Sequence, residues 1–126
     1  MCFCKERRFK THPKESWKMV ERHEAEGYIS ANSIADIFYV TRKSLGGAVA
    51  FDVLRLIMRV FRVVGVAADE ITSAIDYGMK DFEDALQVVC ADKVRAAYFI
   101  TRDSKGFEKV RKMKVLSPEK FIKDIA

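Results

Sequence analysis

Four aspartates are the residues of this sequence whose type and spacing could do chemistry together. Asp36 follows a short expected strand, and Asp103 lies two residues past another. Asp81 and Asp84 stand in the first turn of an expected helix. Carboxylates that converge cannot all stay ionised without a cation, and a set of oxygen ligands suits Mg²⁺ or Mn²⁺. If the four side chains meet, the chemistry that they can support is that of a divalent-metal site.

The elements that must position these aspartates alternate between helix and strand. Apolar spacing, Gly and Pro breaks and capping residues predict helices at 13–26, 33–43, 48–61, 68–77, 81–94 and from 118, and strands at 28–31, 63–66, 97–101 and 114–116. The helix at 48–61 is apolar nearly all round, which is typical of a largely buried helix. Strands separated by helices indicate an α/β fold, a parallel sheet flanked by helices on both faces. The whole chain, 1–126, is expected to form one domain.

Helix N-termini lie at the carboxyl edge of parallel strands, where open α/β sheets bind ligands. We therefore expect the four aspartates on one rim. Each also has a purely structural alternative. Ser33 and Asp36 have the spacing of a capping box, Asp81 and Asp84 fit the N-cap and third position of a helix, and Asp103 begins a turn-like segment.

The distribution of charge suggests a polyanionic partner. The net charge is +5, yet residues 67–92 carry seven acids against Lys80 alone, between two basic ends. A basic protein with one acidic segment suits nucleic acid together with a cation site, although solvated surfaces would give the same counts. No apolar run reaches the ~18 residues of a membrane span.

The cysteines indicate a reducing cytoplasm. There are three of them, an odd number that forms no disulfide framework, and Cys90 is expected to be a core thiol. Cys2 and Cys4 with His12 and His23 fit no established zinc spacing.

Four segments resemble successive blocks of the PIN (PilT N-terminal) domain family, in the family's order. They are 27–43, 80–87, 96–103 and 115–121, and the most specific are Asp-Phe-Glu-Asp-Ala-Leu at 81–86 and Ile-Thr-Arg-Asp at 100–103. The resemblance implies a three-layer fold with a parallel sheet. It also implies a divalent-metal-dependent ribonuclease acting on single-stranded RNA, as in the toxin subunits of toxin–antitoxin pairs.

Carried over by position, the resemblance makes Asp84 and Asp103 metal ligands. Asp36 takes the place of the family's second acid and would help to hold Mg²⁺ or Mn²⁺ or orient water, and Asp81 is a nearby acid that would also face the metal. A bound metal lowers the pKa of its water and neutralises the scissile phosphate.

The same resemblance implies partners. Arg102 and Lys105 would contact the RNA backbone independently of its sequence. An antitoxin protein would be a second partner, held in the acidic cleft.

The sequence departs from the family at its start. Members begin with a central hydrophobic strand that ends in a metal-binding Asp, whereas residues 5–16 here match the region after that strand. Residues 1–4 are too short to replace it and carry no acid. The start codon would then lie inside a longer gene, which the other intact acids favour, or the chain is a degenerate member. A sheet without its central strand invites homo-oligomers, and it leaves open a non-catalytic nucleic-acid-binding or oligomerisation domain.

Overall fold

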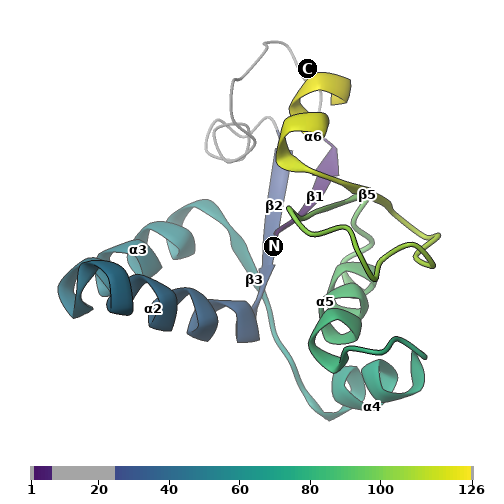
Figure 1. The fold of residues 1–126 in the computed structure, drawn as a ribbon, viewed down its shortest axis with the longest axis horizontal. Coiled ribbons are helices and arrows are strands. Elements are labelled where there is room, and N and C mark those ends of the chain that lie inside the picture. The colour runs from purple at the N-terminus through teal and green to yellow at the C-terminus, as the bar shows by residue number, and fades with distance from the viewer. Residues whose placement is uncertain (1, 7–24, 126) are drawn as a thin grey trace.

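In the computed structural model, which describes residues 2–6 and 25–125, helices and strands alternate as the sequence predicts (Figure 1). The elements are β1 (Cys2–Glu6), β2 (Ala25–Ser30), α2 (Ala31–Leu45), α3 (Gly47–Val60), β3 (Arg62–Val64), α4 (Ala68–Asp76), α5 (Phe82–Lys93), β4 (Tyr98–Ile100), β5 (Lys114–Leu116) and α6 (Pro118–Ile125). The helix expected at 13–26 falls almost wholly outside the described residues, and its last two positions belong to β2. No helix in the described part of the chain has the length and apolar character needed to cross a membrane.

The sheet has the strand order β3-β2-β1-β4-β5. β2 pairs with β3 in parallel, with Ser30 opposite Val64, and β4 pairs with β5 in parallel, with Ile100 opposite Leu116. The two parallel pairs confirm the expected α/β class. Their carboxyl ends meet at one edge, so the segments that follow them share one rim.

The central position of the sheet is occupied by β1, which corrects the expectation that it is vacant. β1 runs antiparallel to both neighbours, with Phe3 opposite Tyr28 on one side and Phe99 on the other. A strand of five residues is long enough to fill this position, because it forms backbone hydrogen bonds with the N–H and C=O groups of both β2 and β4. The reversed direction puts Cys2 opposite Ile100 at the rim, while Glu6 pairs with Ala25 at the other end of the strand. The filled centre therefore still brings no acid of β1 to the rim.

Helices cover both faces of the sheet. Successive residues of a strand face opposite sides, and in β4 Phe99 packs against Phe107 with ring centroids 4.9 Å apart, within the core cluster that α5 contributes to. The preceding residue, Tyr98, contacts Phe121 of α6 with centroids 5.4 Å apart. Phe99, Phe121 and Cys90 are fully buried, and burial raises the pKa of the Cys90 thiol, as expected of a core cysteine.

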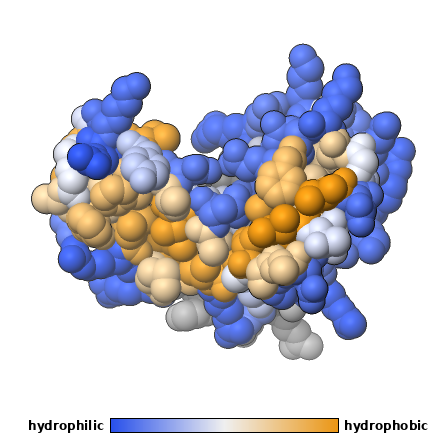
Figure 2. All heavy atoms as spheres, turned by 90° about the horizontal axis from the view of Figure 1, so that it is seen from below, coloured by the Kyte–Doolittle hydropathy of each residue, from blue (hydrophilic) through white to orange (hydrophobic). Residues whose placement is uncertain are grey.

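Helices α2 and α3 form a hairpin that extends away from the sheet (Figure 1). They pack on each other, with the rings of Phe38 and Phe51 4.9 Å apart. The prediction that 48–61 is a buried helix is wrong, because Ala50 is the only buried residue of α3. Figure 2 shows the consequence, which is a broad apolar surface over this hairpin and a second one across the same face of the molecule.

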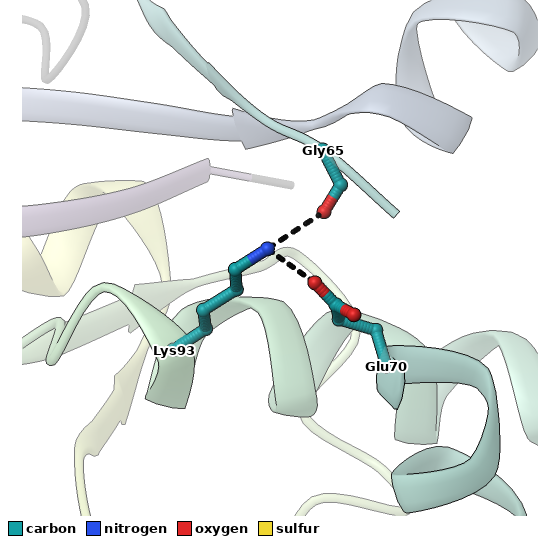
Figure 3. Close-up of polar contacts among 3 residues, drawn as sticks. All are labelled: Gly65, Glu70 and Lys93. Atoms are coloured by element: carbon teal, nitrogen blue, oxygen red, sulfur yellow. Dashed lines mark hydrogen bonds and ion pairs between the residues drawn. The ribbon is translucent and has the colours of Figure 1, made fainter. Parts of the chain in front are cut away.

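An ion pair holds α4 against α5. Nζ of Lys93 contacts Oε1 of Glu70 and lies 3.4 Å from the carbonyl oxygen of Gly65, in the loop that follows β3 (Figure 3). Glu70 is buried, and the hydrogen bond from Lys93 holds the pKa of its carboxyl below the usual range. One side chain thus ties two helices to the end of β3.

Candidate acidic site at the sheet edge

The rim at the carboxyl ends of β2 and β4 gathers acids from three elements. α2 begins directly after Ser30 of β2, and Asp36 lies in its second turn. The segment from Thr101 to Asp103 follows β4. The N-terminus of α5 contributes Asp81 and Glu83 beside Asp84.

Asp81 and Asp84 line one pocket of about 340 Å³ together with three lysines, Lys80, Lys105 and Lys109. Asp81 is the N-cap of α5, and its Oδ1 accepts a hydrogen bond from the backbone N–H of Asp84 at 2.9 Å. Asp81 therefore does cap the helix, as its structural alternative proposed. It leaves the second oxygen of Asp81 and the Asp84 carboxylate available to a ligand in the pocket.

Asp84 is half-buried, and its pKa is raised, first by burial and then by the negative charges of Asp81 and Asp103. Asp103 itself is fixed in a turn. Its backbone N–H donates to Oγ1 of Thr101 at 3.1 Å, and its Oδ1 accepts from the backbone N–H of Lys105 at 3.1 Å. Asp103 therefore does stabilise a turn, as its structural alternative proposed. The turn holds the negative charge of Asp103 close enough to raise the pKa of Asp84.

Asp36 lies beside Glu83, an acid that the sequence analysis did not single out. A hydrogen bond to the Asp36 side chain is the main cause of a raised pKa at Glu83, followed by burial and by repulsion from Asp36, Asp81 and Asp84. The only sequence signal for Glu83 was its place between two other acids in one helical turn. The capping box suggested for Ser33 and Asp36 is absent, because α2 begins at Ala31 and Ser33 lies inside the helix.

A buried polar network underlies this rim. Oγ of Ser30 donates to Oε1 of Gln87 at 2.9 Å, Nε2 of Gln87 donates to Oγ of Ser33 at 2.5 Å, and the two serine oxygens are 2.9 Å apart. All three side chains are buried. Because the network joins the end of β2, the first turn of α2 and the middle of α5, it sets the distance between the helices that carry Asp36 and Glu83.

The chemical type of these side chains fits a hard divalent cation, but their arrangement in space fits one only in part. Every candidate ligand is a carboxylate oxygen, as Mg²⁺ and Mn²⁺ prefer. Oδ1 of Asn32, in the first turn of α2, is a further buried oxygen without a hydrogen-bond partner in the described part of the chain. Within 2–6 and 25–125, however, no three acids, histidines or cysteines come together as a metal-binding group. The arrangement suits Mg²⁺ that keeps most of its water and is held by one or two carboxylates plus a substrate phosphate.

The two basic residues expected to bind nucleic acid have different surroundings. Lys105 lines the acidic pocket. Arg102 is exposed, and its Nη1 pairs with Oε1 of Glu119 in α6 at 2.9 Å. The ion pair uses one nitrogen of Arg102, and the other guanidinium N–H groups of this exposed side chain stay accessible to a phosphate.

A second pocket, of about 610 Å³, lies on the α4 side and is lined by Asp69, Glu70, Asp92, Lys93 and Lys112. Its lysines are already paired, Lys93 with Glu70 and Lys112 with Asp92 at 3.3 Å. We assign no catalytic chemistry to it.

A match to a known family covers the segments that carry the acidic rim. A sequence model described as PIN domain matches residues 2–105, which includes β1 and the rim acids Asp36, Asp81, Glu83, Asp84 and Asp103. No curated protein and no solved structure shows significant similarity to the chain. The match covers most of the sequence, agrees with the α/β sheet and includes the segments 27–43, 80–87 and 96–103 that resemble the family. The chain belongs to the PIN domain family.

Proposed function

We propose that this chain is a divalent-metal-dependent nuclease that cleaves single-stranded RNA at the pocket of Asp81 and Asp84. Its family gives it a nuclease-like fold, and PIN domains generally use divalent metal ions. The observation that carries the proposal is the composition of the pocket, in which the carboxylates of Asp81, Asp84 and Glu108 lie among three lysines. Carboxylates suit a metal and lysines suit a phosphate, and metal-dependent hydrolysis of a phosphodiester uses both.

Each part of the pocket has a role in this proposal. Asp84, with Asp81 and Asp103 near it, would hold Mg²⁺ or Mn²⁺. Burial and then the negative charges of Asp81 and Asp103 raise the pKa of Asp84, and a bound cation would stabilise its ionised form. When bound, the metal supplies an activated water and neutralises the phosphate. Asp36 and Glu83 would position that water through hydrogen bonds. Lysines of the pocket would hold the RNA backbone by charge, independently of its sequence.

The test is cleavage of a fluorescent single-stranded RNA with Mg²⁺ or Mn²⁺, comparing Asp84→Asn with Asp92→Asn. Asp92 lies on the same helix, about 12 Å further along, and pairs with Lys112. We expect Asp84→Asn to lose cleavage by about 100-fold or more and Asp92→Asn to retain it. Equal cleavage by both variants, or cleavage that survives a chelator, contradicts the assignment of this pocket.

A non-catalytic RNA-binding domain is the second candidate. Two observations favour it: β1 brings no acid to the rim, and the described residues contain no metal-binding group of three. Binding without cleavage, falling steeply with salt and unchanged by chelator, would support it. An antitoxin partner stays a prediction, to be tested by co-purification from the native host.

A further inference from the structure

Tyr77 is a wall that the two pockets share. It lines the acidic pocket of Asp81 and Asp84, and it also lines the pocket of about 610 Å³ that α4 and α5 enclose. Tyr77 follows the last residue of α4, and Gly78 after it has a φ of 88°, which glycine adopts without steric cost. Tyr77 is 38% exposed, and its ring contacts no other aromatic ring within residues 2–6 and 25–125. One face of this ring is therefore available to a planar ligand.

The larger pocket suits an uncharged planar group better than a phosphate. Beside Tyr77, its walls include the apolar side chains of Ala67 and Val89. Lys93 also lines it, but the charge of this lysine is already matched by Glu70 (Figure 3). The pocket as a whole carries three acids against two lysines, and this negative balance disfavours a phosphate.

The carboxylate of Asp69 is the acid of this pocket that remains available. Within the described part of the chain it has no ion pair or hydrogen bond, whereas Glu70 and Asp92 are each paired with a lysine. A carboxylate accepts hydrogen bonds and donates none, so it matches the amino group at C4 of cytosine and repels the oxygen at C4 of uracil. The pocket should therefore distinguish two bases of nearly the same size.

We propose that the larger pocket binds a base of the RNA, stacked on Tyr77 and donating its amino group to Asp69, while a phosphate of the same strand lies in the acidic pocket. This inference rests on the proposed function and adds to it a preference for cytosine over uracil. Along α5, Asp84 of one pocket and Val89 of the other are about 7.5 Å apart, a distance that one nucleotide of an extended strand can bridge. Stacking on an aromatic ring needs an unpaired base, so the strand must be single.

Two labelled RNA decamers, one of cytidine and one of uridine, test the role of Asp69 by fluorescence anisotropy. Ca²⁺ replaces Mg²⁺, and gel electrophoresis checks that both RNAs stay intact. We expect the wild type to bind the cytidine decamer at least about 5-fold more tightly, the lower end for one specific base contact. Asp69→Asn should bring the two affinities within about 2-fold of each other, because its amide can donate as well as accept.

The role of Tyr77 in stacking is tested with Tyr77→Ala and Tyr77→Phe. Alanine should weaken the binding of both decamers at least about 5-fold, whereas phenylalanine keeps the ring and should keep the affinity. The salt dependence of binding should not change in Tyr77→Ala, because stacking releases no counterions, but its slope should fall by about one in Lys109→Ala. Tyr39→Ala is the matched control, since Tyr39 is an exposed tyrosine of α2 that lines neither pocket. Circular dichroism checks that each variant is folded.

Two results would overturn the proposal: equal affinity of the wild type for the two decamers, or a folded Tyr77→Ala that binds RNA as tightly as the wild type. If Tyr77→Ala does not fold, the comparison of the wild type with Asp69→Asn decides alone. Either negative result leaves the nuclease intact as long as cleavage still depends on Asp84. Conversely, a preference for cytosine in a chain that never cleaves RNA would support the base pocket and contradict the nuclease, and the absence of any RNA binding would contradict both.

Discussion

Replacing Gln87 by leucine should destabilise the fold in a way that depends on Ser30 and Ser33. The amide of Gln87 is 1% exposed and makes one hydrogen bond to each serine. Leucine has a similar volume but no polar atoms, so the substitution leaves the two buried hydroxyls with only each other. A buried hydrogen bond contributes about 1 kcal/mol net, and an unsatisfied buried group costs about 1–3 kcal/mol.

The effect of the lost hydrogen bonds is best measured as a coupling energy, because the buried leucine side chain also adds hydrophobic stabilisation of its own. In a chain where Ser30 and Ser33 are both alanine, Gln87→Leu removes no partnered hydroxyl. We therefore expect Gln87→Leu to cost about 2 kcal/mol more in the native background than in the double-alanine background. The combined variant should be more stable than Gln87→Leu alone.

Urea unfolding followed by circular dichroism measures all four chains of this cycle. The slope of the free energy of unfolding against urea concentration must stay constant, so that differences in midpoint report stability alone. A coupling energy within about 0.5 kcal/mol of zero would refute the reasoning, because the three side chains would then contribute independently. It would also remove the argument that the network sets the spacing of α2 and α5.

Acid should destabilise the chain through Glu70. The hydrogen bond from Lys93 holds the pKa of the Glu70 carboxyl below 4.5 in the folded chain. The ion pair therefore stabilises the fold fully above the pKa that Glu70 has in the unfolded chain, and this stabilisation is lost as the pH falls through the folded pKa. Glu70→Gln should remove that part of the fall in urea midpoint between about pH 6 and about pH 3. Glu83 has the opposite effect on stability, because Asp36 disfavours the ionised form of Glu83 and raises its pKa. Asp36→Asn should therefore raise the melting temperature at about pH 7 and not at about pH 3. A lower melting temperature at about pH 7 would count against the contact between Asp36 and Glu83. Phe99→Ala should cost about 3–5 kcal/mol by urea titration, because the ring is fully buried; a loss under about 1 kcal/mol would mean that the core collapses around the gap.

Local signals predicted most of the elements. The helix expected at 81–94 is Phe82–Lys93, and it begins where Asp81 caps it. The strand at 114–116 has the predicted bounds, and 97–101 differs by one residue at each end. Caps, apolar periodicity and Gly breaks act between residues close in sequence, so a single chain segment contains the information.

Two expectations failed because they depended on distant residues. An all-apolar pattern at 48–61 cannot tell burial in this chain from burial against another, and α3 proves exposed. Residues 1–4 were expected to be too short to replace the family's first strand, yet Cys2–Glu6 forms β1, because β2 and β4 pair with it on both sides. A strand's direction and its neighbours are long-range properties that its own five residues do not encode.

The candidate site divides in the same way. The sequence by itself determined the kinds of ligand, carboxylates and lysines, and their positions at helix starts and strand ends, because those positions follow from the alternation of elements. Only the tertiary structure decided that Asp84 shares a pocket with Lys105 and Lys109, that Asp36 lies beside Glu83, and that Arg102 pairs with Glu119. These contacts join segments up to tens of residues apart, and packing of helices on the sheet fixes them, which no spacing along the chain can do.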